Sequence, residues 1–213
     1  MHPQESALRT GAQALGLSLD ERQVGQLLAY LDLLGKWNKV YNLTAVRDPG
    51  QMLVQHLLDS LSIVAPLHAH AGARSLRLLD VGSGGGLPGV VIAVCCPRID
   101  VTCVDTVGKK AAFVQQVAGT LALANLRGRH DRVEAITESF DVIVSRAFAS
   151  LVDFTAWSAG ALAEGGVWLA MKGRQPDGEI AALWPWVEVF HVEQLAVPGL
   201  DAERCLVWLR RAG

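Results

Sequence analysis

Hydrophobic positions recur at helical spacing across the first seventy residues of the chain. After residue 20 the apolar side chains repeat three and four positions apart, as expected for one buried helix face: Val24, Leu27, Leu28, Leu31 and Leu34. Ser18 and Glu21 precede this repeat at the spacing of a capping box, which predicts that a helix starts there. A second amphipathic stretch follows Pro49. The pattern therefore predicts a helical extension over residues 1–70.

From about residue 71 the pattern changes to short apolar runs that alternate with helical stretches. Helices are predicted over 87–96, 108–123 and 151–164. The runs that predict strands are 75–81, 99–105, 125–136, 140–147 and 165–173, with two more within 186–211. Such alternation is typical of crossover connections in a parallel sheet.

The last two predicted strands have only a Pro-Gly turn between them, which favours an antiparallel pair at the sheet edge. The fold class is therefore α/β, with a doubly wound, seven-stranded, mainly parallel sheet and an antiparallel last strand. Residues 1–70 form a helical extension and residues 71–213 the core, and we expect the two to make one structural domain.

A glycine-rich loop follows the first predicted strand, in "LLDVGSGGGLPGVVIA" at residues 78–93. Five glycines fall within eight positions, more than a tight turn needs. Glycine adopts positive φ freely and lets a ligand lie against the backbone. Because ligands of doubly wound sheets bind at the carboxyl ends of the strands, we expect a ligand at Gly82, Gly84 and Gly86.

The residues around this loop indicate which ligand it binds. The dinucleotide fingerprint requires a glycine where this chain has Leu87. Asp80 precedes the loop, where a carboxylate suits a ligand with an ammonium group, such as S-adenosylmethionine, better than a pyrophosphate. Asp105 ends the second strand, where a carboxylate accepts both ribose hydroxyls. Val133 and Glu134 follow the third strand, at the expected adenine edge, although Glu134 taken alone reads as a solvated residue.

The composition narrows the classes of partner. The 213 residues include 19 Lys and Arg against 21 Asp and Glu, for a net charge of −2. A nucleic acid must therefore be held by local charge. No apolar stretch reaches the ~20 residues of a membrane span, and no signal-peptide pattern opens the chain, so we expect a cytoplasmic protein without a membrane partner. The four cysteines form no CxxC pair, which predicts buried, reduced thiols and no metal site.

Several motifs together resemble one known family. They are "KWNKVYNLTAV" at 36–46, "HLLDSL" at 56–61, the glycine loop, "VSRAFASL" at 144–151 and "VPGLDAERCLV" at 197–207. Over most of residues 20–210 the chain resembles the RsmG (GidB) family of class I, Rossmann-like methyltransferases. The resemblance implies S-adenosyl-L-methionine as cofactor and methyl transfer to N7 of one guanine near the decoding site of bacterial 16S rRNA. It implies the small ribosomal subunit or an assembly intermediate as partner. We also expect the chain to be a monomer.

The resemblance also assigns site residues. Gly82 and Leu87 fall at the loop contacts, Asp105 at the ribose, Val133 and Glu134 at the adenine. Arg146, in the "SRAF" motif, falls at the cofactor and target, where it would hold guanine O6, a phosphate or the cofactor carboxylate. A structural ion pair with an acid such as Asp153 is the alternative. Lys172, at the end of the fifth strand, is the second catalytic candidate, as an RNA phosphate contact or as an ordinary surface lysine.

Guanine N7 carries a lone pair and no proton, so direct displacement requires no general base. Alignment of the reactants then supplies the catalysis. The product base is cationic, so a nearby arginine is unfavourable unless it is directed elsewhere. Phe148 is expected either to stack on the base or to lie in the core. His56 and Asp59 are interpreted as a helix-to-sheet packing contact, and the six tryptophans as core residues.

Local cations for RNA are available in the sequence, although each alone reads as a solvated residue. The candidates are Lys36, Lys39, Arg47, Lys109, Lys110, Arg127, Arg129 and Arg132. Three other functions stay open on the residues alone. They are methylation of a small molecule, nicotinamide-dependent oxidoreduction, which Leu87 and Asp80 disfavour, and a non-catalytic sensor of an adenosine ligand.

Overall fold

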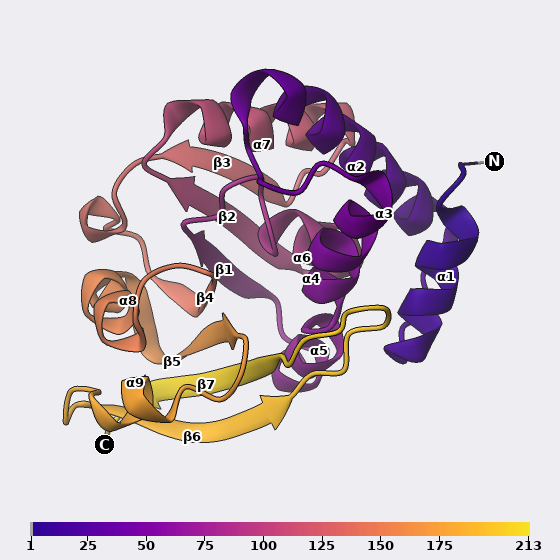
Figure 1. Cartoon of the computed structure of the whole chain (residues 1–213). Coiled ribbons are helices and arrows are strands. Elements are labelled where there is room, and N and C mark those ends of the chain that lie inside the picture. Colours follow the sequence, from indigo (N-terminus) through magenta and orange to yellow (C-terminus); the bar gives the residue numbers. More distant parts are fainter. Residues whose placement is uncertain (1) are drawn as a thin grey trace.

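The computed structural model describes residues 2–213 and shows one sheet with helices on both faces (Figure 1). The sheet has seven strands in the order β3-β2-β1-β4-β5-β7-β6. Their bounds are β1 Leu76–Val81, β2 Ile99–Asp105, β3 Leu126–His130, β4 Phe140–Arg146, β5 Leu162–Lys172, β6 Val187–Gln194 and β7 Cys205–Arg211. The chain reverses direction across the sheet beside β1, so the loops after β1 and β4 meet at the switch point of a doubly wound fold.

The helices fall into an N-terminal group and a group that connects the strands. The first group is α1 Glu5–Ala14, α2 Glu21–Tyr41, α3 Pro49–Met52, the π-helix η1 Leu53–Leu58, α4 Asp59–Leu61 and α5 Val64–Ala71. The second group is α6 Gly89–Cys95, α7 Gly108–Thr120, the 3₁₀ turn η2 Val133–Ala135, α8 Leu151–Ser158, the 3₁₀ turn η3 Ala159–Ala161 and α9 Asp177–Ala181. None of the helices within residues 2–213 is long and apolar enough to cross a bilayer.

The strand directions confirm the predicted fold class. Strands β1 to β5 pair in parallel, and β7 runs antiparallel to both β5 and β6. The last two strands thus form the predicted antiparallel pair, with β7 inserted between β5 and the edge strand β6.

Three local predictions are wrong. The capping box of α2 is formed by Asp20 and Gln23, so the helix begins at Glu21 rather than after Ser18. The helix predicted over 151–164 ends at Ser158, because the chain must enter β5 at Leu162 to pair with Phe140 of β4. Trp157, Trp184 and Trp186 are 42%, 48% and 39% exposed, so these three tryptophans do not belong to the core.

One apolar cluster joins the helical extension to the sheet. It runs from Leu8, Leu27 and Leu57 in the N-terminal helices to Val91 and Val142 in the core. A second cluster fills the other face of the sheet, beneath α8. The four cysteines are free and buried, as predicted.

Helix α2 supports the glycine loop directly. The fully buried Tyr30 hydroxyl donates a hydrogen bond of 2.7 Å to the carbonyl oxygen of Gly85. A Cβ at Gly85 would lie 2.9 Å from Cδ1 of Leu34, so glycine lets α2 approach the loop closely. The helical extension therefore helps to shape the loop.

We expect Tyr30→Phe to lower the free energy of unfolding by about 1–3 kcal/mol, because the buried carbonyl of Gly85 loses its donor while the ring stays in place. Urea denaturation followed by circular dichroism measures this. Tyr41→Phe, at a 42% exposed tyrosine, is the matched control. Equal stability of the two variants would contradict a supporting role for Tyr30.

Candidate active site

The loop between β1 and α6 presents bare backbone at the carboxyl ends of the strands. Gly82, Gly84 and Gly86 have φ of 66°, 57° and 87°, in the region that favours glycine. A Cβ at Gly82 would lie 2.4 Å from Cδ2 of Phe148, and one at Gly86 would lie 2.5 Å from Cγ2 of Val90. A Cβ at Gly84 would meet only the carbonyl oxygen of Gly82, at 4.0 Å. The loop is thus packed at Gly82 and Gly86 and open at Gly84.

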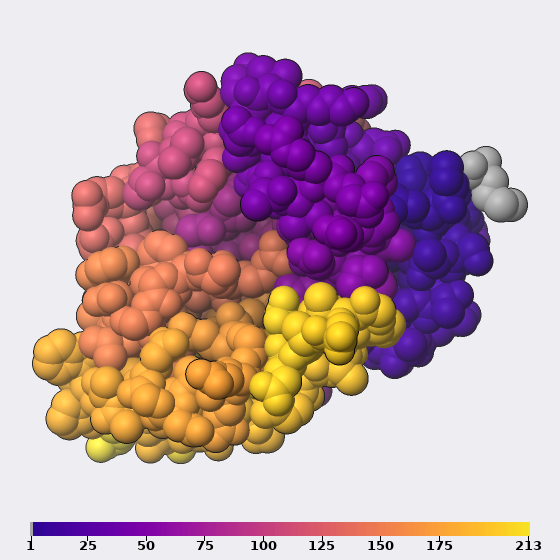
Figure 2. Space-filling model, viewed as in Figure 1, coloured from indigo at the N-terminus to yellow at the C-terminus, as the bar shows by residue number. Residues whose placement is uncertain are grey.

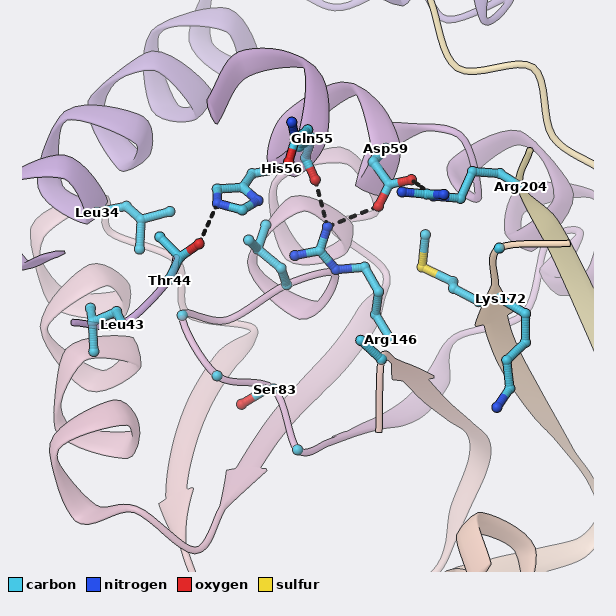
Figure 3. Close-up of a pocket in the computed structure, with 17 residues that line it drawn as sticks. Leu34, Leu43, Thr44, Gln55, His56, Asp59, Ser83, Arg146, Lys172 and Arg204 are labelled. Carbon is cyan, nitrogen blue, oxygen red and sulfur yellow. Dashed lines mark hydrogen bonds and ion pairs between the residues drawn. The ribbon is translucent and has the colours of Figure 1, made fainter. Parts of the chain in front are cut away.

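Two cavities meet at this loop, where Gly82 and Ala147 line both. The first, here the loop cavity, has a volume of about 540 Å³. Its polar lining comes from the loop, from η1 and α4, from the ends of β4 and β5, and from Arg204 (Figure 3). The second, here the β2 cavity, has a volume of about 350 Å³ and lies beside the end of β2. In Figure 2 the surface is hollowed between the purple segment that follows α2 and the orange segment that follows β4.

Asp105 lies in the β2 cavity, as the sequence predicts for a ribose ligand. The side chain is 7% exposed, and its two oxygens accept hydrogen bonds from Gly84 N–H at 3.0 Å and Val107 N–H at 2.9 Å. Lys110 Nζ lies 3.6 Å from Oδ2. Each carboxylate oxygen keeps lone-pair capacity for a further donor. Asp105 therefore orders the glycine loop and faces the β2 cavity at the same time.

Val133 and Glu134 also line the β2 cavity, on the 3₁₀ turn η2. Val133 is buried, and the Glu134 side chain is 40% exposed and pairs with Arg132 at 3.2 Å. Phe148 closes the cavity from the β4 side, with its ring 5.9 Å from that of Trp157 in an edge-on arrangement. The cavity thus combines an apolar wall, which includes Val133, Phe148 and Trp157, with charged groups. The charged residues of its lining are Asp105, Lys110, Asp131, Arg132 and Glu134.

Asp80 lines neither cavity, contrary to the expectation that its carboxylate faces a ligand ammonium. It is fully buried behind the loop, and its Oδ2 accepts a hydrogen bond of 2.8 Å from Gly89 N–H at the start of α6. Oδ1 has no hydrogen-bond partner. Burial raises the pKa of Asp80 to about 7, an effect that the Gly89 hydrogen bond opposes. Asp80 therefore links β1 to the first residue of α6 through this hydrogen bond.

Arg146 pairs with Asp59 and not with Asp153. Its Nη1 donates to Oδ2 of Asp59 at 2.8 Å and to the carbonyl oxygen of Gln55 at 2.7 Å. Arg204 Nε donates to the other oxygen, Oδ1, of Asp59 at 2.8 Å (Figure 3). Asp153 instead lies in the first turn of α8, where its N–H bonds to the Ser150 hydroxyl. Asp59 thus binds one arginine with each oxygen.

His56 and Asp59 are both buried, as a packing contact requires, yet both also line the loop cavity. They lie at the end of the π-helix η1, a geometry frequent at functional sites. His56 Nε2 lies 2.9 Å from the Thr44 hydroxyl. Burial lowers the pKa of His56 to about 4, and Arg146 contributes to this shift. His56 is therefore neutral at pH 7.

Sequence reasoning missed Asp59 and Arg204 as site residues. The motifs "HLLDSL" and "VPGLDAERCLV" contribute to the family resemblance without assigning a role to Asp59 or Arg204, and these two residues are 145 positions apart. For Asp59, the signal in the sequence was a carboxylate among apolar positions of a helix. A buried charge requires a partner, so such a residue predicts a buried ion pair.

Lys172 lines the loop cavity but is paired. Its Nζ lies 2.8 Å from Oε2 of Glu179 and donates to the carbonyl oxygen of Ala149 at 3.2 Å. Among the other cations proposed for RNA, Arg129 pairs with Asp131 and Glu138, and Arg132 with Glu134. Within residues 2–213, no group of three or more His, Cys, Asp or Glu side chains has the arrangement of a metal site.

The chain matches known proteins over nearly its whole length. Residues 23–207 match the family model described as "rRNA small subunit methyltransferase G". The chain is 66% identical to "Ribosomal RNA small subunit methyltransferase G" of Acidovorax sp. (strain JS42), with 97% of this chain and 95% of that protein covered. It is 58% identical to the protein of the same name from Albidiferax ferrireducens, covering 100% and 99%.

Solved structures of low sequence identity share the fold. Magnesium protoporphyrin IX methyltransferase from Synechocystis PCC 6803, a structure with bound SAH, has a TM-score of 0.58 at 15% identity. That match covers 90% of this chain and all of the other. TrmN from Thermus thermophilus has a TM-score of 0.56 at 18% identity, over 72% of this chain and 49% of that one.

The raised pKa of Asp80 predicts a pH dependence of stability. The folded protein holds the proton up to about pH 7, whereas the unfolded chain releases it near 3.8. The stability that this proton confers is complete below the unfolded value and is lost as the pH rises to about 7. We therefore expect the unfolding free energy of the wild type, relative to Asp80→Asn, to fall by up to about 1.4 kcal/mol per pH unit between pH 5 and 7 and then to level off.

Urea denaturation at half-unit pH steps measures this difference. The matched control is Asp141→Asn. This carboxylate accepts a hydrogen bond from the Arg77 N–H near the amino-terminal ends of β4 and β1. Parallel stability curves for the wild type and Asp80→Asn would contradict the raised pKa.

Asp59 is the single carboxylate that lines the loop cavity, where it compensates Arg146 and Arg204. We expect Asp59→Asn to weaken binding of S-adenosylmethionine about tenfold more than that of S-adenosylhomocysteine. Only the first carries a sulfonium charge, and without the Asp59 carboxylate the charges of Arg146 and Arg204, which it pairs with, would oppose that charge. A tenfold difference corresponds to about 1.4 kcal/mol.

Calorimetric titration of both compounds tests this expectation, with Asp141→Asn as control. A structural defect alone would weaken both compounds equally, and that result would contradict the charge-compensating role of Asp59.

Proposed function

Because the chain belongs to the family of rRNA small subunit methyltransferase G, we propose that it transfers a methyl group from S-adenosyl-L-methionine to N7 of one guanine in small-subunit ribosomal RNA. The observation that supports this most is the pair of cavities that meet at a bare glycine loop. The β2 cavity has carboxylates that can accept hydrogen bonds from an adenosine, and the loop cavity has volume and polar groups for a base. The sulfonium of the bound cofactor would lie against the glycine loop between the two cavities.

The residues of the β2 cavity fit the cofactor. Asp105 would accept the ribose hydroxyls, and Val133 and Glu134 would border the adenine. Gly82, Gly84 and Leu87 would hold the methionine part along the loop cavity, while Gly86 and Asp80 would shape the loop from behind. When bound, S-adenosylmethionine supplies an electrophilic methyl group on a sulfonium.

The residues of the loop cavity suit a base that requires no deprotonation. His56 is neutral and engaged with Thr44. Arg146 uses Nη1 for Asp59 and Gln55, which leaves Nε and Nη2 to donate to guanine O6, a phosphate or the cofactor carboxylate. Since Asp59 compensates the guanidinium charge, Arg146 can lie near a base that becomes cationic. Lys172, held by Glu179, would border the RNA.

We infer that the protein acts in the cytoplasm as a monomer, on the small ribosomal subunit or an assembly intermediate. The apolar cluster shared by residues 1–70 and 71–213 supports a single structural domain. The chain would therefore meet its RNA with both parts as one rigid surface.

The proposal is tested with tritium-labelled S-adenosylmethionine and small ribosomal subunits from cells that lack this protein. Naked ribosomal RNA and total tRNA are assayed in parallel, and borohydride–aniline cleavage locates 7-methylguanosine. We expect one cut in the small-subunit RNA. Asp105→Ala is the control variant, with cofactor affinity lower by about 2–3 kcal/mol, or tens-fold. Cofactor binding without label in any RNA would contradict the proposal and favour a small-molecule substrate.

A further inference from the structure

A groove outside the two cavities follows the end of α2 and the segment after it. It has a volume of about 480 Å³ and is lined by three cationic residues, Lys36, Lys39 and Arg47. Residues 36–47, "KWNKVYNLTAVR", carry these three cations and no acid, in a chain whose net charge is −2. Asp32 is the one acid of the groove lining, and it lies 3.4 Å from His2. The groove, here the α2 groove, is therefore a local concentration of positive charge.

The cations of the α2 groove are not engaged in ion pairs within residues 2–213. Lys36, Lys39 and Arg47 have no carboxylate within 4.0 Å, and Arg47 donates only to the side-chain oxygen of Asn42 at 3.0 Å. By contrast, Arg129 and Arg132 beside the β2 cavity are neutralised by acids. The positive charges of the α2 groove are therefore available to bind an anionic ligand.

The groove and the loop cavity lie on two sides of one short segment. Asn38 in α2 holds this segment, accepting from Thr44 N–H at 2.8 Å and donating to the Val46 carbonyl oxygen at 3.1 Å. Thr44 lines the loop cavity, and Arg47 lines the groove. Three residues span at most about 11 Å, so a strand with a base in the cavity reaches the groove within a few nucleotides.

Exposed apolar surface lies at the same helix end. Val40 is 69% exposed and Tyr41 42% exposed. The Tyr41 ring lies 4.9 Å from Trp37, and Lys109 Nζ lies 5.2 Å from its centroid. This ring lies at the last residue of α2, beyond the groove lining, and the lysine beside it is Lys109 of α7. An exposed ring next to a lysine is a combination on which single-stranded nucleic acid stacks and binds.

We propose that the α2 groove is the docking surface for the single-stranded RNA that flanks the target base. Lys36, Lys39 and Arg47 bind its phosphates, and Tyr41 provides a ring for one flanking base. This inference rests on the proposed function and adds where the RNA runs: over the segment between Asn42 and Asp48. Phosphates fit this surface because, within residues 2–213, none of the three cations forms an ion pair and the one acid of the groove lining, Asp32, lies against His2.

The test compares two double variants with the same change in net charge. Lys36→Glu with Lys39→Glu alters the groove. Arg74→Glu with Arg98→Glu is the matched control, at exposed arginines that precede β1 and β2 and donate only to backbone carbonyls. For both variants we measure methylation of naked small-subunit RNA and of assembled small subunits, RNA binding over a range of salt concentrations, and binding of S-adenosylmethionine.

We expect the groove variant to lose at least tenfold in kcat/KM for RNA while its affinity for S-adenosylmethionine is unchanged. Losing two phosphate contacts on a single strand lowers the slope of log affinity against log salt by about 1.4. The control should stay close to the wild type. Tyr41→Ala should lose about tenfold in RNA affinity, with Tyr41→Trp restoring it.

Equal losses in the groove variant and the control would overturn the proposal, as would an unchanged salt slope. A loss seen on assembled subunits but not on naked RNA would also overturn it, in favour of an acidic protein surface. If the charge reversal impairs folding, Lys36→Gln with Lys39→Gln gives the same test, and a wild-type slope for that variant would reject the groove. A wild type that methylates no RNA would instead refute the proposed function.

Discussion

The bare backbone of the loop after β1 is the constraint on which the rest of the structure depends. Glycines at alternate positions have the most conformational freedom to lose, so the loop must be held from outside. Three side chains do this: Tyr30 at the Gly85 carbonyl, Asp105 at Gly84 N–H and Asp80 at Gly89 N–H. They come from α2, β2 and β1, so the helical extension and the sheet shape the same loop.

This arrangement explains why one carboxylate can serve both fold and site. Asp105 accepts from Gly84 N–H of the loop with Oδ2 and from Val107 N–H with Oδ1, and it faces the β2 cavity with the remaining lone pairs. Asp80, two residues before the loop, is enclosed by β1, Cys103 and α6 and takes no part in the lining. The two acids thus differ because Gly89 of α6 and Cys103 of β2 cover Asp80, whereas Asp105 is the last residue of its strand and lines the β2 cavity.

The sequence was sufficient for features that depend on local order. Strand ends, the glycine loop and Asp105 follow from residue periodicity and from the rule that parallel strands end at one edge. It was insufficient for contacts between distant positions. Tyr30 meets Gly85 across 55 positions and Arg146 meets Asp59 across 87. The sequence also did not predict where α8 ends. The Ala-rich stretch after Ser158 favours a helix, but the pairing of Leu162 with Phe140 outweighs this propensity.

The cationic side chains of the loop cavity are neutralised by carboxylates, in part through these contacts between distant positions. Arg146, Arg204 and Lys172 each lie against a carboxylate, from Asp59 or Glu179, so the cavity gathers donors without a large excess of positive charge. That balance suits chemistry in which a cation approaches and a cationic product leaves. The uncompensated cations lie beyond Thr44, in the α2 groove. The fold thus separates the paired cations of the loop cavity from the cations of the α2 groove, which form no ion pair within residues 2–213. The short segment held by Asn38 and His56 lies between them.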